Sequence, residues 1–109
     1  PVSLFINPST DDIAVSKETG ADMVEIHTGL YANAKGSKQE KELVKVARSV
    51  KDALSLGLGA NAGHGLNYFN VKSVAAIEGL RGLYIGHSIV SRAVLVGIER
   101  AVREMKVFL

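Results

Sequence analysis

All three histidines of the chain follow short apolar runs that have the pattern of buried strands. His27 lies in EIHTG, His64 in NAGHG and His87 in IGHS, and a helical pattern comes after each bend. Glu25 precedes His27 by two residues, so the two side chains project from the same face of a strand. A histidine at such a strand end can donate a hydrogen bond to a phosphate or pass a proton to a substrate beside it.

Each of these residues also has a structural interpretation. Glu25 lies in an otherwise apolar strand and could form a salt bridge with a lysine or arginine, because an unpaired buried carboxylate is costly. His27 could simply orient its neighbours. Three histidines and a glutamate could also hold zinc. However, the sequence lacks His-x-His and His-Glu-x-x-His spacings, and glycines beside the histidines suit an anion better than a cation. We therefore predict no metal site.

Glycines surround two of the histidines. His64 has a glycine on each side, and another glycine precedes His87. Without a Cβ, the backbone N–H groups of such bends can approach an anion closely. The helix after each bend favours negative charge at its N-terminus. In eight-unit barrels the last two loops often hold a phosphate in this way. The sequence therefore predicts an anion between residues 63–65 and 86–88.

Four predicted strands alternate with four predicted helices. The strands are expected at residues 2–6, 22–27, 57–62 and 82–86. The helices are expected at residues 9–20, 37–57, 70–79 and 91–109. Ser37 and Glu40 have the spacing of a capping box at the start of the second helix. This alternation implies an α/β fold with a parallel sheet and right-handed crossovers. Four units make either a small open sheet or half of a (β/α)8 TIM barrel, which typically has about 250 residues.

The composition is that of one ordinary globular domain, with 109 residues of which 47% are hydrophobic and 22% charged. The net charge is only +2 and the charged residues are scattered along the chain, which argues against nucleic acid or membrane partners. The absence of cysteine excludes disulfides and fits a reducing compartment. No signal peptide or membrane-spanning run is visible. The chain starts without methionine inside a predicted strand and stops inside a predicted helix, so we expect a longer protein.

The motifs VSLFIN, EIHTGLYA, LGLGANAGHGLNYFNV and GLYIGHSIVSRAVLVGIERAVREM together resemble the C-terminal half of the pyridoxine 5′-phosphate synthase family. The resemblance runs through nearly all of residues 1–109. It implies units five to eight of an eight-unit barrel, with the N-terminal half absent from this chain. It also implies condensation of 3-amino-2-oxopropyl phosphate with 1-deoxy-D-xylulose 5-phosphate to pyridoxine 5′-phosphate, inorganic phosphate and water, without a metal or organic cofactor.

The resemblance further assigns residue roles. It implies that His64 is the proton donor, that Glu25 stabilises the transition state, and that Gly65, Gly86 and His87 bind the phosphate of the amino-ketone. The family's first half supplies the general bases and the deoxyxylulose phosphate site, so we expect this chain alone to be inactive. We expect a cytoplasmic homo-oligomer completed by the N-terminal half. Two alternatives stay open: another phosphosugar-handling barrel enzyme, and a non-catalytic phosphate-binding half-barrel.

Overall fold

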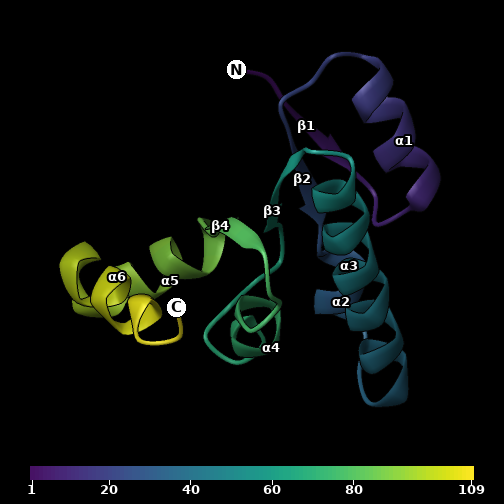
Figure 1. Cartoon of the computed structure of the whole chain (residues 1–109). Helices are drawn as coiled ribbons and strands as arrows, with labels where there is room; N and C mark the ends of the chain where they lie inside the picture. The colour runs from purple at the N-terminus through teal and green to yellow at the C-terminus, as the bar shows by residue number, and fades with distance from the viewer.

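The computed structural model describes residues 1–109 as four strands and six helices (Figure 1). The strands are β1 (Ser3–Ile6), β2 (Met23–His27), β3 (Gly59–Gly63) and β4 (Leu80–Tyr84). The helices are α1 (Thr10–Glu18), α2 (Gly29–Asn33), α3 (Ser37–Ser55), α4 (Val71–Ala75), α5 (His87–Val96) and α6 (Ile98–Lys106). The strands form one sheet in the order β1-β2-β3-β4, and all neighbours are parallel. The prediction of an α/β fold with a parallel sheet is confirmed.

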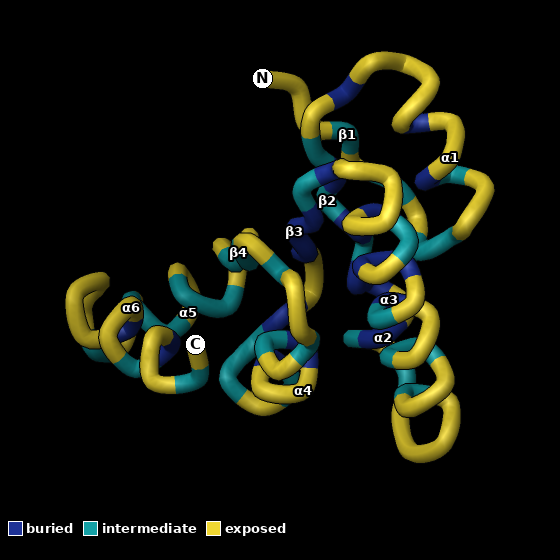
Figure 2. Tube along the Cα trace, in the orientation of Figure 1, coloured by how far each residue is buried: buried dark blue, intermediate teal, exposed yellow.

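The sheet has one covered face and one open face. The first hydrophobic core lies between the covered face and helices α1 and α3 (Figure 2). It consists of Ile13, Val24, Ile26, Val46, Val50, Ala53, Leu58 and Ala60. On the open face, by contrast, Phe5 is 55% exposed and Tyr84 is 53% exposed. Sequential parallel strands covered on one face are the arrangement of consecutive units in a (β/α)8 barrel, whereas strand order reverses in a doubly wound sheet.

A second hydrophobic core supports the loop between β3 and α4. It consists of Tyr31, Ala62, Leu66, Val71, Val74 and Met105, which come from five different segments of the chain. Two partly buried tyrosine hydroxyls strengthen it: Tyr31 Oη donates to the Asn70 carbonyl and Tyr68 Oη to the Ala101 carbonyl, both over 2.7 Å. The loop is thereby attached both to α2 and to α6.

The prediction of one helix over residues 91–109 is wrong. Gly97 has a φ of +86°, which a continuous right-handed helix does not allow, and it separates α5 from α6. The residues of α5 and α6 are buried to different extents as a result. Met105 on α6 is buried, whereas Val94 on α5 is 81% exposed. Neither of these helices, nor any other in the chain, has the length and apolar character needed to cross a membrane.

Other predicted boundaries shift by a few residues. β4 begins at Leu80 rather than at residue 82, because the chain turns at Gly79, which has a φ of +93°. The capping box predicted between Ser37 and Glu40 is not formed. Instead Gly36 is the N-cap of α3, and its carbonyl accepts a hydrogen bond from the Glu40 N–H.

The two faces of α3 should differ in their contribution to stability. Val50 is 1% exposed in the first core, whereas Val44 on the same helix is 58% exposed. In the full-length protein, Val50→Ala should lower the free energy of unfolding by about 2 kcal/mol, through lost burial and a new cavity. Val44→Ala should change it by less than about 0.5 kcal/mol. Urea unfolding of both variants checks the difference, and equal losses would contradict the assignment of the covered face.

Candidate functional site

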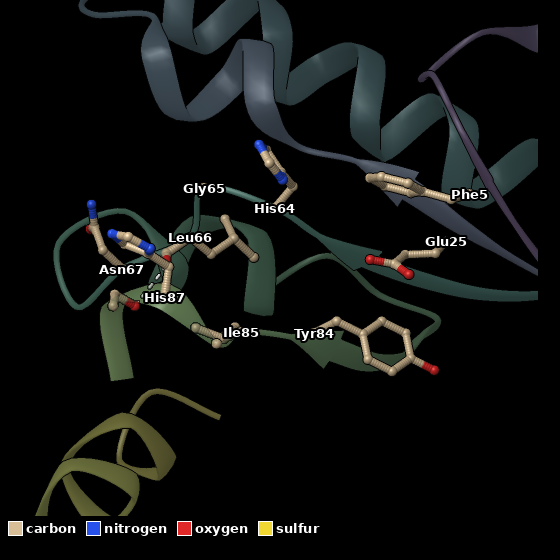
Figure 3. A pocket seen from close by; sticks show the side chains of 11 residues that line it. Phe5, Glu25, His64, Gly65, Leu66, Asn67, Tyr84, Ile85 and His87 are labelled. Carbon is tan, nitrogen blue, oxygen red and sulfur yellow. Dashed lines mark hydrogen bonds between the residues drawn. The ribbon is translucent and has the colours of Figure 1, made fainter. Parts of the chain in front are cut away.

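A cavity of about 650 Å³ lies at the carboxyl ends of the strands (Figure 3). Its lining consists of Phe5, Glu25, His64, Gly65, Leu66, Asn67, Tyr84, Ile85, Gly86, His87 and Ser88. The five residues to which the family resemblance assigns roles are all among them, and His27 is not. Phe5, Glu25 and Tyr84 lie at one end of the cavity and Asn67 and His87 at the other, with His64 between the two ends (Figure 3). The structure therefore separates a carboxylate end from an end made of two glycine-containing loops.

Glu25 reaches the cavity from the open face of β2, because Gly63 on β3 leaves room for it. A Cβ on Gly63 would lie 2.5 Å from the carboxylate Oε1 of Glu25. No lysine or arginine pairs with Glu25, since the ion pairs of the chain are formed elsewhere. The structural salt bridge is thus absent. Burial raises the pKa of the Glu25 carboxyl, and the nearby charge of His64 partly opposes this shift.

His64 is the only residue other than glycine with a positive φ, at +85°. Both the hydroxyl and the N–H of Thr28 contact this bend. The Thr28 hydroxyl lies 2.7 Å from the Gly63 carbonyl oxygen and 2.6 Å from that of His64, and the Thr28 N–H donates to the Gly63 carbonyl over 2.8 Å. The imidazole therefore stands on a bend that is fixed from the neighbouring strand end.

His27 packs beside this bend instead of entering the cavity. Its Nδ1 accepts a hydrogen bond from the Gly29 N–H over 2.9 Å, so a neutral ring carries its proton on Nε2. The ring stacks on Phe5 with centroids 4.9 Å apart, and its centroid lies 4.6 Å from that of His64. Burial lowers the pKa of His27, and the charge of His64 lowers it further. His27 is accordingly a neutral neighbour of His64.

The second loop of the cavity ends at the N-terminus of α5. His87 is the first residue of this ten-residue helix and Gly86 is its N-cap, so His87 is helical and not part of a loop. Gly86 lines the cavity, and a Cβ on it would meet nothing within 4 Å. The Ser88 hydroxyl donates to the Leu66 carbonyl over 2.9 Å and joins the second loop to the first.

Both loops present backbone N–H groups without protein acceptors. None of the N–H groups of residues 64–66 or 86–88 donates a hydrogen bond within the chain. The carbonyls of residues 63–66, in contrast, all accept side-chain hydrogen bonds, from Thr28, Asn70 and Ser88. Free N–H groups at two loops, one of which starts a helix, form a suitable binding site for an anion such as phosphate.

The three histidines do not converge on one point. His27 and His64 are neighbours, but His87 lies at the N-terminus of α5, and no group of three or more histidine, aspartate or glutamate side chains is close enough together to hold a metal ion.

The sequence interpretation missed the polar residues that shape the loops. Thr28, Asn70 and Ser88 bond to loop carbonyls that lie between 5 and 36 residues away in sequence. Helix α2, which starts directly after Thr28, was also missed because it has only five residues. A hydroxyl or amide residue beside each glycine-rich bend was the sequence feature that could have indicated these contacts. Such side chains commonly form hydrogen bonds with loop backbone.

Comparison with protein families matches residues 1–109 to the family described as pyridoxal phosphate biosynthesis protein PdxJ. Two similar relatives are named pyridoxine 5′-phosphate synthase. The one from Thermodesulfovibrio yellowstonii is 69% identical over 106 residues, and the one from Geobacter sp. (strain M21) is 60% identical over 105 residues. These matches cover 97% and 95% of this chain but 44% of each relative, so the chain spans less than half their length. The chain belongs to the PdxJ family of pyridoxal phosphate biosynthesis proteins.

Proposed function

We propose that the protein containing this chain is a pyridoxine 5′-phosphate synthase. It condenses 3-amino-2-oxopropyl phosphate with 1-deoxy-D-xylulose 5-phosphate to pyridoxine 5′-phosphate, inorganic phosphate and water. The family match over residues 1–109 and the names of the relatives support this reaction. This chain supplies units five to eight of the barrel, and the rest of the protein closes the open face of the sheet. The active form is a cytoplasmic homo-oligomer.

The two ends of the cavity suggest which residues bind the substrate and which act in catalysis. The phosphate of the amino-ketone binds at the loop end, where Gly65, Gly86 and His87 surround free N–H groups. Its carbon chain then extends toward Glu25, whose carboxylate stabilises positive charge in the transition state. His64 lies between the two ends and donates the proton. No step in this assignment requires a metal or an organic cofactor.

The single observation that carries the proposal is the presence of Glu25 and the two anion-binding loops in one cavity. A barrel enzyme that shared only the phosphate loops would have no use for a carboxylate with a raised pKa and no cationic partner. A non-catalytic phosphate-binding half-barrel would have no use for it either. The observation therefore favours the synthase over both alternatives.

Replacing His64 should slow catalysis much more than it weakens substrate binding. With both substrates supplied, the full-length protein should form pyridoxine 5′-phosphate. His64→Ala should lower kcat about 10²–10⁴-fold, with a smaller change in KM, because a general acid acts mainly in the transition state. His64→Asn is the matched variant, since asparagine tolerates a positive φ but cannot act as this acid. A folded wild-type protein that forms no product would refute the proposed function.

Gly86→Val should have the opposite kinetic signature. Its side chain would enter the open space beside the N-cap of α5 and obstruct the phosphate. Loss of one charge-assisted hydrogen bond corresponds to an increase of about 10–100-fold in KM for the amino-ketone phosphate, with little change in kcat. Gly86→Ala should be intermediate, because it adds only a methyl group. Steady-state kinetics of both variants test this, and an unchanged KM for Gly86→Val would remove the phosphate from this loop.

The acid side of the pH profile should report the titration of Glu25. The Glu25 pKa is raised, so its carboxyl stays protonated to a higher pH than usual and loses its negative charge early as the pH falls. If the carboxylate form is needed, kcat must decrease as the pH falls through this raised pKa. Glu25→Gln should lower kcat and remove this acid limb, whereas Glu25→Asp should retain one. The measurement is log kcat against pH, and the same limb in Glu25→Gln would assign it to another group.

A further inference from the structure

We propose that Thr28 is a positioning residue of this site. Its hydroxyl holds His64 in the left-handed backbone conformation and directs the N–H groups of His64 and Gly65 toward the bound anion. The inference rests on the proposed function, because it explains how the proton donor and part of the phosphate site are presented together.

The hydroxyl of Thr28 is dedicated to the bend at His64. Thr28 is the N-cap of α2, a position at which a threonine side chain commonly bonds to its own helix. Here it makes no such bond. The side chain is 0% exposed, and its hydroxyl lies within 2.7 Å of the Gly63 and His64 carbonyl oxygens instead. The Thr28 hydroxyl thus bonds to a loop 35 residues away in sequence and not to its own helix. We infer that its role is to fix the conformation of that loop.

The geometry of the peptide bond turns this contact into an orientation of N–H groups. In a trans peptide the carbonyl and the N–H point in opposite directions. The Gly63 carbonyl shares a peptide with the His64 N–H, and the His64 carbonyl shares one with the Gly65 N–H. Both carbonyls face Thr28, so both N–H groups face away from it. His64 and Gly65 line the cavity and Thr28 does not, and neither N–H has a protein acceptor.

The conformation of His64 needs such external support. A residue with a Cβ avoids positive φ values, and one that adopts them is normally held by its surroundings. Without the hydroxyl, the Gly63 carbonyl would keep the Thr28 N–H as a donor, but the His64 carbonyl would lose its only side-chain partner, and the peptide between His64 and Gly65 could rotate. The imidazole would then leave its place between the two ends of the cavity, and the N–H groups would no longer converge on an anion.

The test compares Thr28→Val, which removes only the hydroxyl, with Thr28→Ser, which retains it, in the full-length protein. Thr28→Val should lower kcat by about 10²-fold, as expected for a catalytic group displaced by about 1 Å. It should also raise KM for the amino-ketone phosphate. Thr28→Ser should stay within about threefold of the wild-type kcat. Val46→Ala, in the first core and far from the cavity, is the control for a loss of stability alone: it should lower Tm and leave kcat of the folded protein unchanged.

Crystal structures of both Thr28 variants give a readout that does not depend on turnover. A rotated peptide at residues 63–65 in Thr28→Val, with the bend retained in Thr28→Ser, supports the proposal even if the wild-type protein fails to form pyridoxine 5′-phosphate, which would refute only the proposed reaction. A wild-type kcat and an unchanged φ at His64 in Thr28→Val would overturn the proposal. If Thr28→Val does not fold, Thr28→Cys replaces it, because a thiol is a weak donor. A wild-type kcat in folded Thr28→Cys would also overturn the proposal.

Discussion

The parallel pairing of β2 with β3 is the constraint on which the whole site depends. In this register Glu25 lies opposite Asn61 and His27 opposite Gly63, so the end of β2 and the end of β3 fall at the same level. Thr28 therefore comes next to the bend at His64. A slip of one residue would turn Glu25 to the covered face of the sheet and separate the two motifs, because side chains alternate between the faces.

Glycines on the open face of the sheet weaken its strands but leave space for larger side chains of the neighbouring strands. Three glycines on β3 and β4 lie on this face, and a Cβ on any of them would crowd a larger side chain of a neighbouring strand. Gly63 lies against the carboxylate of Glu25, Gly59 against Met23 and Gly82 against Asn61. Glycine weakens a strand, so β3 is held mainly by its covered face, where Ala60 and Ala62 are fully buried. The same residues that make β3 a poor strand former thus make room for the site.

Local patterns in the sequence were enough to predict the order of the four strands and the rim on which Glu25 and the histidines lie. Both depend on apolar periodicity and on glycine at the turns, which are properties of neighbouring residues. The function of Thr28 was not predictable in this way, because it depends on contacts with residues 63 and 64 that only the folded sheet creates. The irregular register of β4 with β3 between Ala60 and Asn61 is likewise a property of the folded sheet and not of neighbouring residues. Gly97 was visible, but a helical pattern continues on both sides of it.

The division of the interior into two cores has a consequence for the order of folding. All members of the first core lie between residues 13 and 60, so their contacts can form without the rest of the chain. The second core takes only Tyr31 from this region and depends on residues 62–105 for the rest. His64 follows directly after the boundary between the two. Because contacts between nearby segments form early, the first core is expected to assemble before the second, and the bend that carries the imidazole lies between the segments that form the two cores.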